Sequence, residues 1–358
     1  MVKVLLCNRP GLARAKKAIV ILLSLFFVVA CSQQRDEDPN FKLSGETMGT
    51  TYHITVLNNG EAKADKEVIQ QAVDKQLQQV NQQMSTYIPD SELSQLSSAP
   101  VDKAIKVSPD LFDVLMLSLQ VSWLSNGAFD ITVGPLVDLW GFGPGGAEHE
   151  DKVPTPEQIA EARKNVGYDA LELDMVGHTV TKHRNVTLDL SGVAKGFGVD
   201  KVAELLDYAG FTDYMVEIGG ELRLKGHNPR GEPWRIAIEE PDPGSIHVVH
   251  QALNISNEAM ATSGDYRNYF EKNGRRYSHT IDPSTGYPIQ HKLASVTVIA
   301  KNCAEADALA TALDVLGPEK GMKLAKQQNL PVYMIVKRDK GFESIYSDAF
   351  KPYLSKKN

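Results

Sequence analysis

Two oxygen-bearing side chains stand four residues apart in a helical segment, residues 302–317 (NCAEADALATALDVLG): Asp307 and Thr311. Residues at i and i+4 lie on the same face of a helix. A carboxylate and a hydroxyl suit a hard cation such as Mg²⁺, which prefers oxygen ligands. Two ligands are too few, so a second segment, for example through a backbone carbonyl, has to complete such a site. By spacing alone, an Asp and a Thr on a solvated helix face is the better interpretation.

A histidine marks a second candidate position. His279 lies in residues 278–283 (SHTIDP), where a strand is expected to end in an Asp-Pro turn. Its ordinary pKa lies close to neutrality, so it could act as a general base. A single histidine is, however, more often a structural residue, and the sequence around it leaves both interpretations open.

Small residues and a lysine form a third segment, residues 188–200 (LDLSGVAKGFGVD). The pattern predicts a strand, a turn of small residues and then a helix. Gly192, Ala194 and Gly196 would let the backbone lie close to a ligand. The helix N-terminus would offer free N–H groups to a phosphate, and Lys195 would add a positive charge. Tight packing of a strand against a helix is the alternative explanation.

Glycine, proline and aromatic residues are dense in residues 127–144, which include GAFD, TVGP and WGFGP. This density is typical of an ordered loop, and such a loop could hold an aromatic ring. A rigid surface loop without a ligand is the alternative.

The elements that must position these residues mix helices and strands. The sequence predicts helices over residues 68–84, from 108 to near 127, from 155 to 167, and over 195–208 and 303–316. Strands are expected over 51–57, 171–190 with a break at 176–177, 214–224, 234–239, 248–255, 277–281, 294–300 and 331–336. Since strands outnumber helices and do not alternate with them regularly, the pattern favours an α+β fold.

Composition narrows the class of protein. The chain has 358 residues and a net charge of −7, which argues against a nucleic-acid binder because such proteins normally carry a basic surface. The sequence contains no phosphate-loop, HExxH, GxSxG or CxxC signature and no GxGxxG that follows a predicted strand.

The N-terminal segment reads as a leader. Residues 1–17 carry five basic residues and no acid, and residues 18–30 (AIVILLSLFFVVA) have serine as their one polar residue. A membrane-spanning helix needs roughly 20 apolar residues, so this run fits a signal peptide better. It ends in VVAC, which resembles a bacterial lipobox with Cys31 as the lipidated residue. An ordinary signal peptide with a chance cysteine is the alternative.

Three parts follow from this division: a signal peptide over residues 1–30, a polar tether over 31–42, and one catalytic unit over 43–350. Without its leader the chain would have 328 residues and a net charge of −12. Cys303 would then be the single free thiol, so an internal disulfide is excluded.

Eight segments, in order along nearly the whole mature chain, together resemble the ApbE family of FAD:protein FMN transferases. They are MGTTY (48–52), MSTYIPDSELSQL (84–96), GAFDITVGPLVDLWGFG (127–143), LDLSGVAKGFGVD (188–200), VEIGGELRLKG (216–226), ATSGDYRNYF (261–270), YSHTIDPSTGYPI (277–289) and CAEADALATALDVLG (303–317). The resemblance implies an α+β, T-fold-like architecture with FAD in a cleft.

The resemblance also assigns residues. It implies a Mg²⁺ site made by Asp307, Thr311 and the Ala194 carbonyl, with His279 as the base. The positions that match flavin- or adenine-contacting segments are Met48, Tyr87, Ala128, Phe129, Asp130, Ser191, Lys195 and Ile281.

The implied activity is Mg²⁺-dependent transfer of the FMN part of FAD to a threonine hydroxyl of an acceptor protein, with release of AMP. The implied acceptors are flavoprotein subunits of Na⁺-translocating NADH:quinone reductase and its Rnf relatives at the inner membrane. A lipid anchor would hold the protein on the periplasmic side of that membrane. A periplasmic FAD pyrophosphatase that yields FMN and AMP, and a non-enzymatic FAD-binding lipoprotein, are the alternatives.

Overall fold

The computed structural model describes residues 40–58, 65–144, 153–241, 248–264, 269–272 and 275–355. Residues from Asn40 onward form one compact unit. The predicted signal peptide, Cys31 and most of the predicted tether lie outside the described residues. The first strand begins at Phe41, so the segment predicted as a tether overlaps that strand by two residues.

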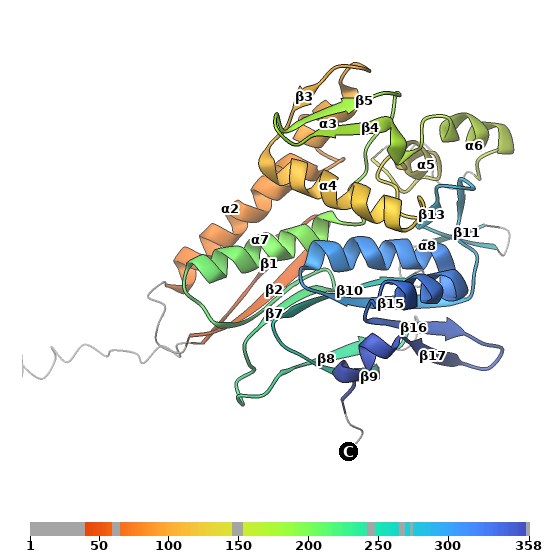
Figure 1. The fold of residues 1–358 in the computed structure, drawn as a ribbon. Coiled ribbons are helices and arrows are strands. Elements are labelled where there is room, and N and C mark those ends of the chain that lie inside the picture. Colours follow the sequence, from red (N-terminus) through yellow and green to blue (C-terminus); the bar gives the residue numbers. More distant parts are fainter. Residues whose placement is uncertain are drawn as a thin grey trace, which may run out of the picture. The chain divides into compact units, whose positions relative to one another are not determined.

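An eight-stranded antiparallel sheet runs through the molecule in the order β1-β2-β6-β7-β10-β15-β16-β17 (Figure 1). Its strands are β1 (Phe41–Thr47), β2 (Thr50–Leu57), β6 (Asp213–Ile218), β7 (Glu221–Lys225), β10 (Glu258–Gly264), β15 (Leu293–Ala300), β16 (Val332–Lys337) and β17 (Phe342–Tyr346). Seven of the eight residues of β15 are buried, because both faces of the sheet are covered.

Helices cover one face of this sheet. They are α2 (Lys66–Met84), α4 (Pro109–Leu124), α7 (Ala194–Tyr208) and α8 (Cys303–Gln327). Figure 1 shows α7 and α8 end to end along the sheet, with α4 lying over α8. Helix α2 buries the apolar residues at positions 69, 73, 77, 80 and 84, which share one face at helical spacing.

The opposite face packs against a two-stranded ribbon of β8 (Trp234–Glu239) and β9 (Val249–Ile255), and against the 3₁₀ helix η3 (Asp348–Tyr353). Trp234, Leu253 and Phe350 from this layer share one apolar cluster with Leu224 and Ile335 of the sheet. The result is an α+β fold, as predicted, with helices gathered on one side of an antiparallel sheet.

Shorter helices and strands lie outside the eight-stranded sheet. They are α3 (Glu92–Ser98), β3 (Ile105–Lys106), α5 (Gly134–Leu139), α6 (Pro156–Arg163), η2 (Tyr168–Ala170), β4 (Leu171–Asp174), β5 (Thr179–Lys182), β11 (Tyr269–Lys272), β12 (Arg275–Ser278), β13 (Ile281–Asp282) and β14 (Tyr287–Pro288). Strands β3, β5 and β4 form a small antiparallel sheet, while β11–β12 and β13–β14 are hairpins.

The predicted starts of the helices at 108 and 155 agree with the structure, and both helices begin after a capping residue. The Ser108 hydroxyl accepts a hydrogen bond from the Leu111 N–H and caps α4. Thr155 and Gln158 form a capping box at the start of α6. That helix ends at Arg163, earlier than the expected stop at Gly167.

Several predicted elements differ from the structure. The strand expected over 214–224 is two strands, β6 and β7, with the Gly219–Gly220 turn between them. The strand expected over 277–281 is broken at positions 279–280, between β12 and β13. The strand expected to run to 190 ends at Lys182. The helix expected to stop before Gly317 and Pro318 resumes after a kink at that glycine, whose φ is 74°, and continues to Gln327. Proline fits the first turn of a new helical segment, so the kink redirects the helix without ending it.

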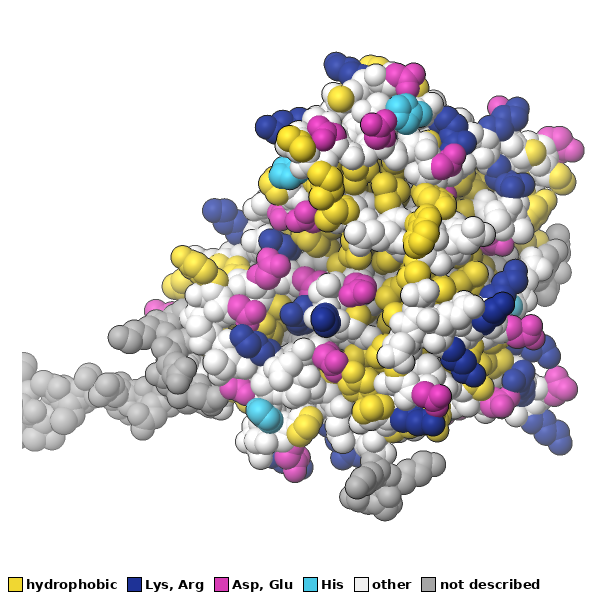
Figure 2. All heavy atoms as spheres, in the orientation of Figure 1, with side chains coloured by type: hydrophobic (Ala, Val, Ile, Leu, Met, Phe, Trp, Pro, Cys, Tyr) yellow, Lys and Arg dark blue, Asp and Glu magenta, His cyan; other side chains and the backbone are white. Residues whose placement is uncertain are grey.

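Charges of both signs share the surface. On the face drawn in Figure 2, lysine and arginine side chains are interspersed with aspartate and glutamate among the described residues. Within those same ranges, no helix combines the length and the apolar character needed to cross a bilayer.

Candidate active site

One cavity of about 1320 Å³ opens at the edge where the sheet, α2, α7 and α8 meet the loop after α4. It is lined by every one of the twelve residues predicted for catalysis, metal binding or flavin contact: Met48, Tyr87, Ala128, Phe129, Asp130, Ser191, Ala194, Lys195, His279, Ile281, Asp307 and Thr311. Segments that are far apart in sequence therefore converge on one site.

The Asp307 side chain reaches the cavity from the first turns of α8 and is 2% exposed. Its Oδ2 accepts a hydrogen bond of 3.0 Å from the Gly196 N–H, while Oδ1 makes no hydrogen bond to any described residue. Burial raises the pKa of this carboxyl, and the charge of Lys195 opposes that rise. One turn along the same face, the Thr311 hydroxyl lies 3.4 Å from the Ser263 hydroxyl.

These oxygens fit a hard cation. A Cβ added at Gly192 would lie 3.1 Å from the Thr311 Oγ1, so the glycine keeps the space beside the hydroxyl open. In the described part of the chain, no group of three or more His, Cys, Asp or Glu residues could hold a metal ion. A metal at this position would therefore use mixed oxygen ligands, of which the unpaired Asp307 Oδ1 is the charged one.

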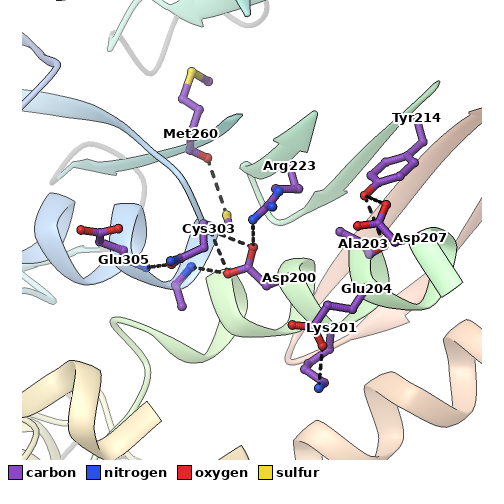
Figure 3. A network of polar contacts seen from close by, with 12 residues as sticks. Asp200, Lys201, Ala203, Glu204, Asp207, Tyr214, Arg223, Met260, Cys303 and Glu305 are labelled. Atoms are coloured by element: carbon purple, nitrogen blue, oxygen red, sulfur yellow. Dashed lines mark hydrogen bonds and ion pairs between the residues drawn. The ribbon is translucent and has the colours of Figure 1, made fainter. Parts of the chain in front are cut away.

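A polar network fixes α7 against α8 (Figure 3). The Asp200 carboxylate accepts hydrogen bonds of 2.8–2.9 Å from the N–H groups of Cys303 and Ala304, the first two residues of α8. It also pairs with the Arg223 guanidinium at 2.9 Å. A Cβ at Gly196 would lie 2.4 Å from the Cys303 carbonyl oxygen, so only glycine permits this contact. The network brings the start of α7 to Asp307.

Replacing Asp200 with alanine is expected to lower the free energy of unfolding by about 3 kcal/mol, because it leaves Arg223 without its buried partner and the N–H groups of Cys303 and Ala304 without their acceptor. Denaturant unfolding measures this. The control Asp110→Asn, which replaces a partly exposed ion pair with Lys201 at 3.4 Å, should change stability by less than about 1 kcal/mol. Equal effects of the two substitutions would contradict the assignment.

The start of α7 offers fewer free N–H groups for phosphate binding than the sequence suggested. The N–H groups of Val193 and Ala194 donate to the Leu190 carbonyl, and that of Gly196 donates to Asp307. Of the N–H groups of residues 194–196, these bonds leave that of Lys195. Positive charge in this part of the cavity comes from the Lys195 side chain.

Lys195 lies among buried carboxylates. Its ammonium is 3.6 Å from the Oε1 of Glu221, whose side chain is 5% exposed. The charge of Asp307, followed by that of Glu221, raises the pKa of Lys195. Burial raises the pKa of Glu221, an effect that Lys195 opposes. Lys195 is thus held as a cation inside the cavity.

His279 occupies the two-residue break between β12 and β13. Its ring meets Phe142 edge to face, with the ring centroids 6.4 Å apart. The next residue, Thr280, donates its hydroxyl to the Asp314 carboxylate at 3.3 Å. Since Asp314 lies seven residues after Asp307 on α8, one helix face positions both the candidate metal ligands and the segment that carries the histidine.

The aromatic loop supports this histidine segment. The Trp140 indole N–H donates to the Gly286 carbonyl at 2.8 Å, and the ring packs against Tyr277 and Tyr287. Trp140 is 1% exposed and does not line the cavity. Trp140 is therefore not the residue through which this loop would hold a ligand ring. Its contacts instead anchor the turn that follows His279.

The chain matches known proteins over most of its length. A model of the ApbE family matches residues 48–334. The chain belongs to the ApbE family. A Haemophilus influenzae relative named FAD:protein FMN transferase is 45% identical, over 94% of this chain and 98% of its own. An Escherichia coli K12 relative of the same name is 37% identical, over 95% and 98% of the two chains.

Solved ApbE structures share the fold. The flavin transferase ApbE from Vibrio cholerae has a TM-score of 0.82 and 46% identity, with 88% of this chain and 99% of that chain covered. The apo form of the flavinyl transferase ApbE from Pseudomonas stutzeri has a TM-score of 0.81 and 40% identity, with 88% and 96% covered. The ApbE fold predicted from the sequence is confirmed, and the chain is a member of a family of flavin transferases.

Two of the residues predicted to contact the flavin or adenine, Asp130 and Tyr87, make hydrogen bonds within the protein. Both carboxylate oxygens of Asp130 accept hydrogen bonds within the loop, from Thr132 and from the Tyr168 N–H at 3.0 Å. Tyr87 is 68% exposed at the cavity rim, with its hydroxyl 3.3 Å from the Phe142 carbonyl. The side chain of Asp130 therefore shapes the loop, and the exposed Tyr87 ring is open to a ligand.

Sequence reasoning assigned no contact to Glu221, which follows the Gly219–Gly220 turn and lines the cavity. It also passed over Asp189, which lines the same cavity and accepts the Ser191 N–H at 2.8 Å. For Glu221 the sequence signal is an acid directly after a pair of glycines. This signal is weak, because nothing near it in the sequence indicates that Lys195 lies opposite.

Proposed function

We propose that this protein catalyses the Mg²⁺-dependent transfer of the FMN part of FAD to a threonine hydroxyl of an acceptor protein, with release of AMP. The relatives named FAD:protein FMN transferase support the activity. The observation that carries it in this chain is the convergence of Asp307, Thr311, Lys195 and His279 on one cavity of about 1320 Å³. Such a cavity has room for a dinucleotide and for an acceptor side chain.

In this reaction the acceptor Oγ forms a bond to the phosphorus of the FMN half of FAD. The bond from that phosphorus to the oxygen of the AMP half breaks, and AMP leaves with that oxygen. His279 takes the hydroxyl proton. Asp307, Thr311 and the Ala194 carbonyl are the proposed ligands of Mg²⁺, which when bound supplies positive charge at the pyrophosphate. The Lys195 ammonium adds a second, fixed positive charge.

Hydrolysis of FAD would use the same site with water as the nucleophile and would give FMN and AMP. A carrier would bind FAD without turnover. The presence of His279 and of the paired oxygens on α8 favours an enzyme over a carrier, because a carrier needs neither a base nor a metal.

One experiment separates the three. The protein is incubated with FAD, Mg²⁺ and an acceptor domain that carries the threonine, and covalent flavin fluorescence is read on a denaturing gel while AMP is quantified. Equal amounts of labelled acceptor and AMP are expected. AMP without labelled acceptor would identify a hydrolase, and bound FAD with neither product would identify a carrier.

We further propose that the protein is lipidated at Cys31 and held at the periplasmic side of the inner membrane. There it would meet flavoprotein subunits of the Na⁺-translocating NADH:quinone reductase or Rnf type. The apolar run that ends at Ala30 supports the leader, and the family resemblance supports the acceptors. Mass spectrometry of the N-terminal peptide from membranes tests this, because an unmodified Cys31 would contradict the anchor.

A further inference from the structure

Lys195 lies between two buried acids but is not equally close to both. The ion pair within 4.0 Å is with Glu221, at 3.6 Å, and no such pair with Asp307 is present among the described residues. Yet the charge of Asp307 is the largest cause of the raised pKa of Lys195. The Asp307 carboxylate is therefore near enough to interact with the ammonium, which rests beside Glu221.

The turn before Glu221 holds the lysine stem in this position. Gly219 and Gly220 both adopt positive φ values, 60° and 106°, which suit glycine. A Cβ at Gly219 would lie 3.3 Å from Cδ of Lys195 and 2.9 Å from the Thr50 methyl group. The bare backbone of this turn thus forms one wall along the lysine, and Glu221 follows at its end.

The ion pair with Lys195 uses only one of the two carboxylate oxygens of Glu221, its Oε1. Its Oε2 is buried and accepts no hydrogen bond from any residue that the structure describes, although the side chain lines the cavity. An unsatisfied buried carboxylate oxygen normally costs stability, so its retention needs a reason. The position of Lys195 offers one, because a cation free to reach the unpaired Oδ1 of Asp307 would compete with a metal for that oxygen.

We propose that Glu221 is a positioning residue that holds the Lys195 ammonium away from Asp307 and so keeps the Asp307 carboxylate available to a divalent cation. The inference rests on the metal site of the proposed function. Without Glu221, the lysine would spend most of its time paired with Asp307, and the apparent affinity for the cation would fall in proportion to the remaining open fraction.

The test measures cation binding directly, with Mn²⁺ followed by electron paramagnetic resonance in the full-length protein without FAD. Glu221→Gln is expected to weaken Mn²⁺ binding about tenfold, as for a site that is open about a tenth of the time. Lys195→Met should bind Mn²⁺ at least as tightly as the parent. The double variant should recover the affinity lost in Glu221→Gln, because the competing cation is gone.

Turnover provides a second measurement that a purely structural role would not produce. In Glu221→Gln the Mg²⁺ concentration for half-maximal transfer should rise about tenfold, while kcat at saturating Mg²⁺ should stay within about threefold of the parent. Glu204→Gln is the matched control. It removes the ion pair of 2.7 Å with Lys201 on the same helix as Lys195, away from the cavity, and should leave Mn²⁺ binding unchanged.

The outcomes separate this inference from the proposed function. If the parent binds Mn²⁺ and Asp307→Asn abolishes binding, the metal site stands. Unchanged binding in Glu221→Gln, or weaker binding in Lys195→Met, would then overturn the role of Glu221 alone. Mn²⁺ binding that is indifferent to Asp307 would overturn the metal site itself. Lys195→Met decides the question even if Glu221→Gln fails to fold.

Discussion

Asp307→Asn is expected to lower the transfer rate about 10³-fold and to remove its dependence on Mg²⁺. Asparagine keeps the size of the side chain and an oxygen that can accept the Gly196 N–H at 3.0 Å. It removes the negative charge and leaves a poorer ligand at the position of the unpaired Oδ1. Loss of metal stabilisation worth about 4 kcal/mol corresponds to this factor. Initial rates across a Mg²⁺ titration measure it.

Two controls narrow the interpretation. Glu305→Gln removes a carboxylate two residues earlier on α8 that does not line the cavity, and should leave transfer unchanged. Thr311→Val removes the neighbouring hydroxyl and keeps the shape, so it should raise the Mg²⁺ requirement, while Thr311→Ser should preserve it. An Asp307→Asn variant with normal rate and normal Mg²⁺ dependence would contradict the metal site.

Local signals carried much of the candidate site. The spacing of Asp307 and Thr311 places them on one face because an α-helix fixes that geometry wherever it packs. Ser108 and Thr155 cap the helices that follow them, and such helix starts can be predicted because capping is a contact between near neighbours in sequence. The α+β class followed from the order of strands and helices in the same way.

Long-range pairings were not readable from the sequence. The role proposed for Glu221 depends on its ion pair with Lys195, which lies on another element. The two residues meet only because the sheet packs against α7. The Gly196 N–H appeared free for a ligand in the sequence, but it is taken by Asp307, more than a hundred residues later. Trp140 has the character of a ligand-stacking residue, yet it is buried against Tyr277 and Tyr287.

One element, α8, connects these observations. Asp200 holds its first turn, and its next turns present Asp307 and Thr311 to the cavity. Its buried Asp314 accepts the Thr280 hydroxyl beside His279. The metal ligands and the base therefore share one rigid support, which suits a reaction that depends on positioning and charge.

The second large effect concerns that base. His279→Ala is expected to lower kcat for transfer about 10²–10⁴-fold, the usual contribution of a positioned general base. FAD affinity and the Mg²⁺ requirement should stay close to those of the parent, because Asp307 and Lys195 are untouched. Single-turnover formation of fluorescent acceptor, together with FAD binding by fluorescence quenching, separates the two quantities.

Chemical rescue distinguishes a base from a structural residue. Free imidazole should restore part of the rate in His279→Ala, since the substitution leaves a space beside Phe142 where the ring was. The matched control is His250→Ala, because His250 lies on β9 with its ring nitrogen 2.7 Å from the Ser344 hydroxyl and does not line the cavity. That variant should transfer FMN normally.

A His279→Ala enzyme with a normal rate would remove the base assignment, whereas a slow variant without rescue and with a lowered melting temperature would point to a structural histidine. Because the Thr280 bond to Asp314 does not involve the imidazole, the backbone around position 279 should persist in the variant, and a loss of rate with intact FAD binding then reports the missing proton acceptor.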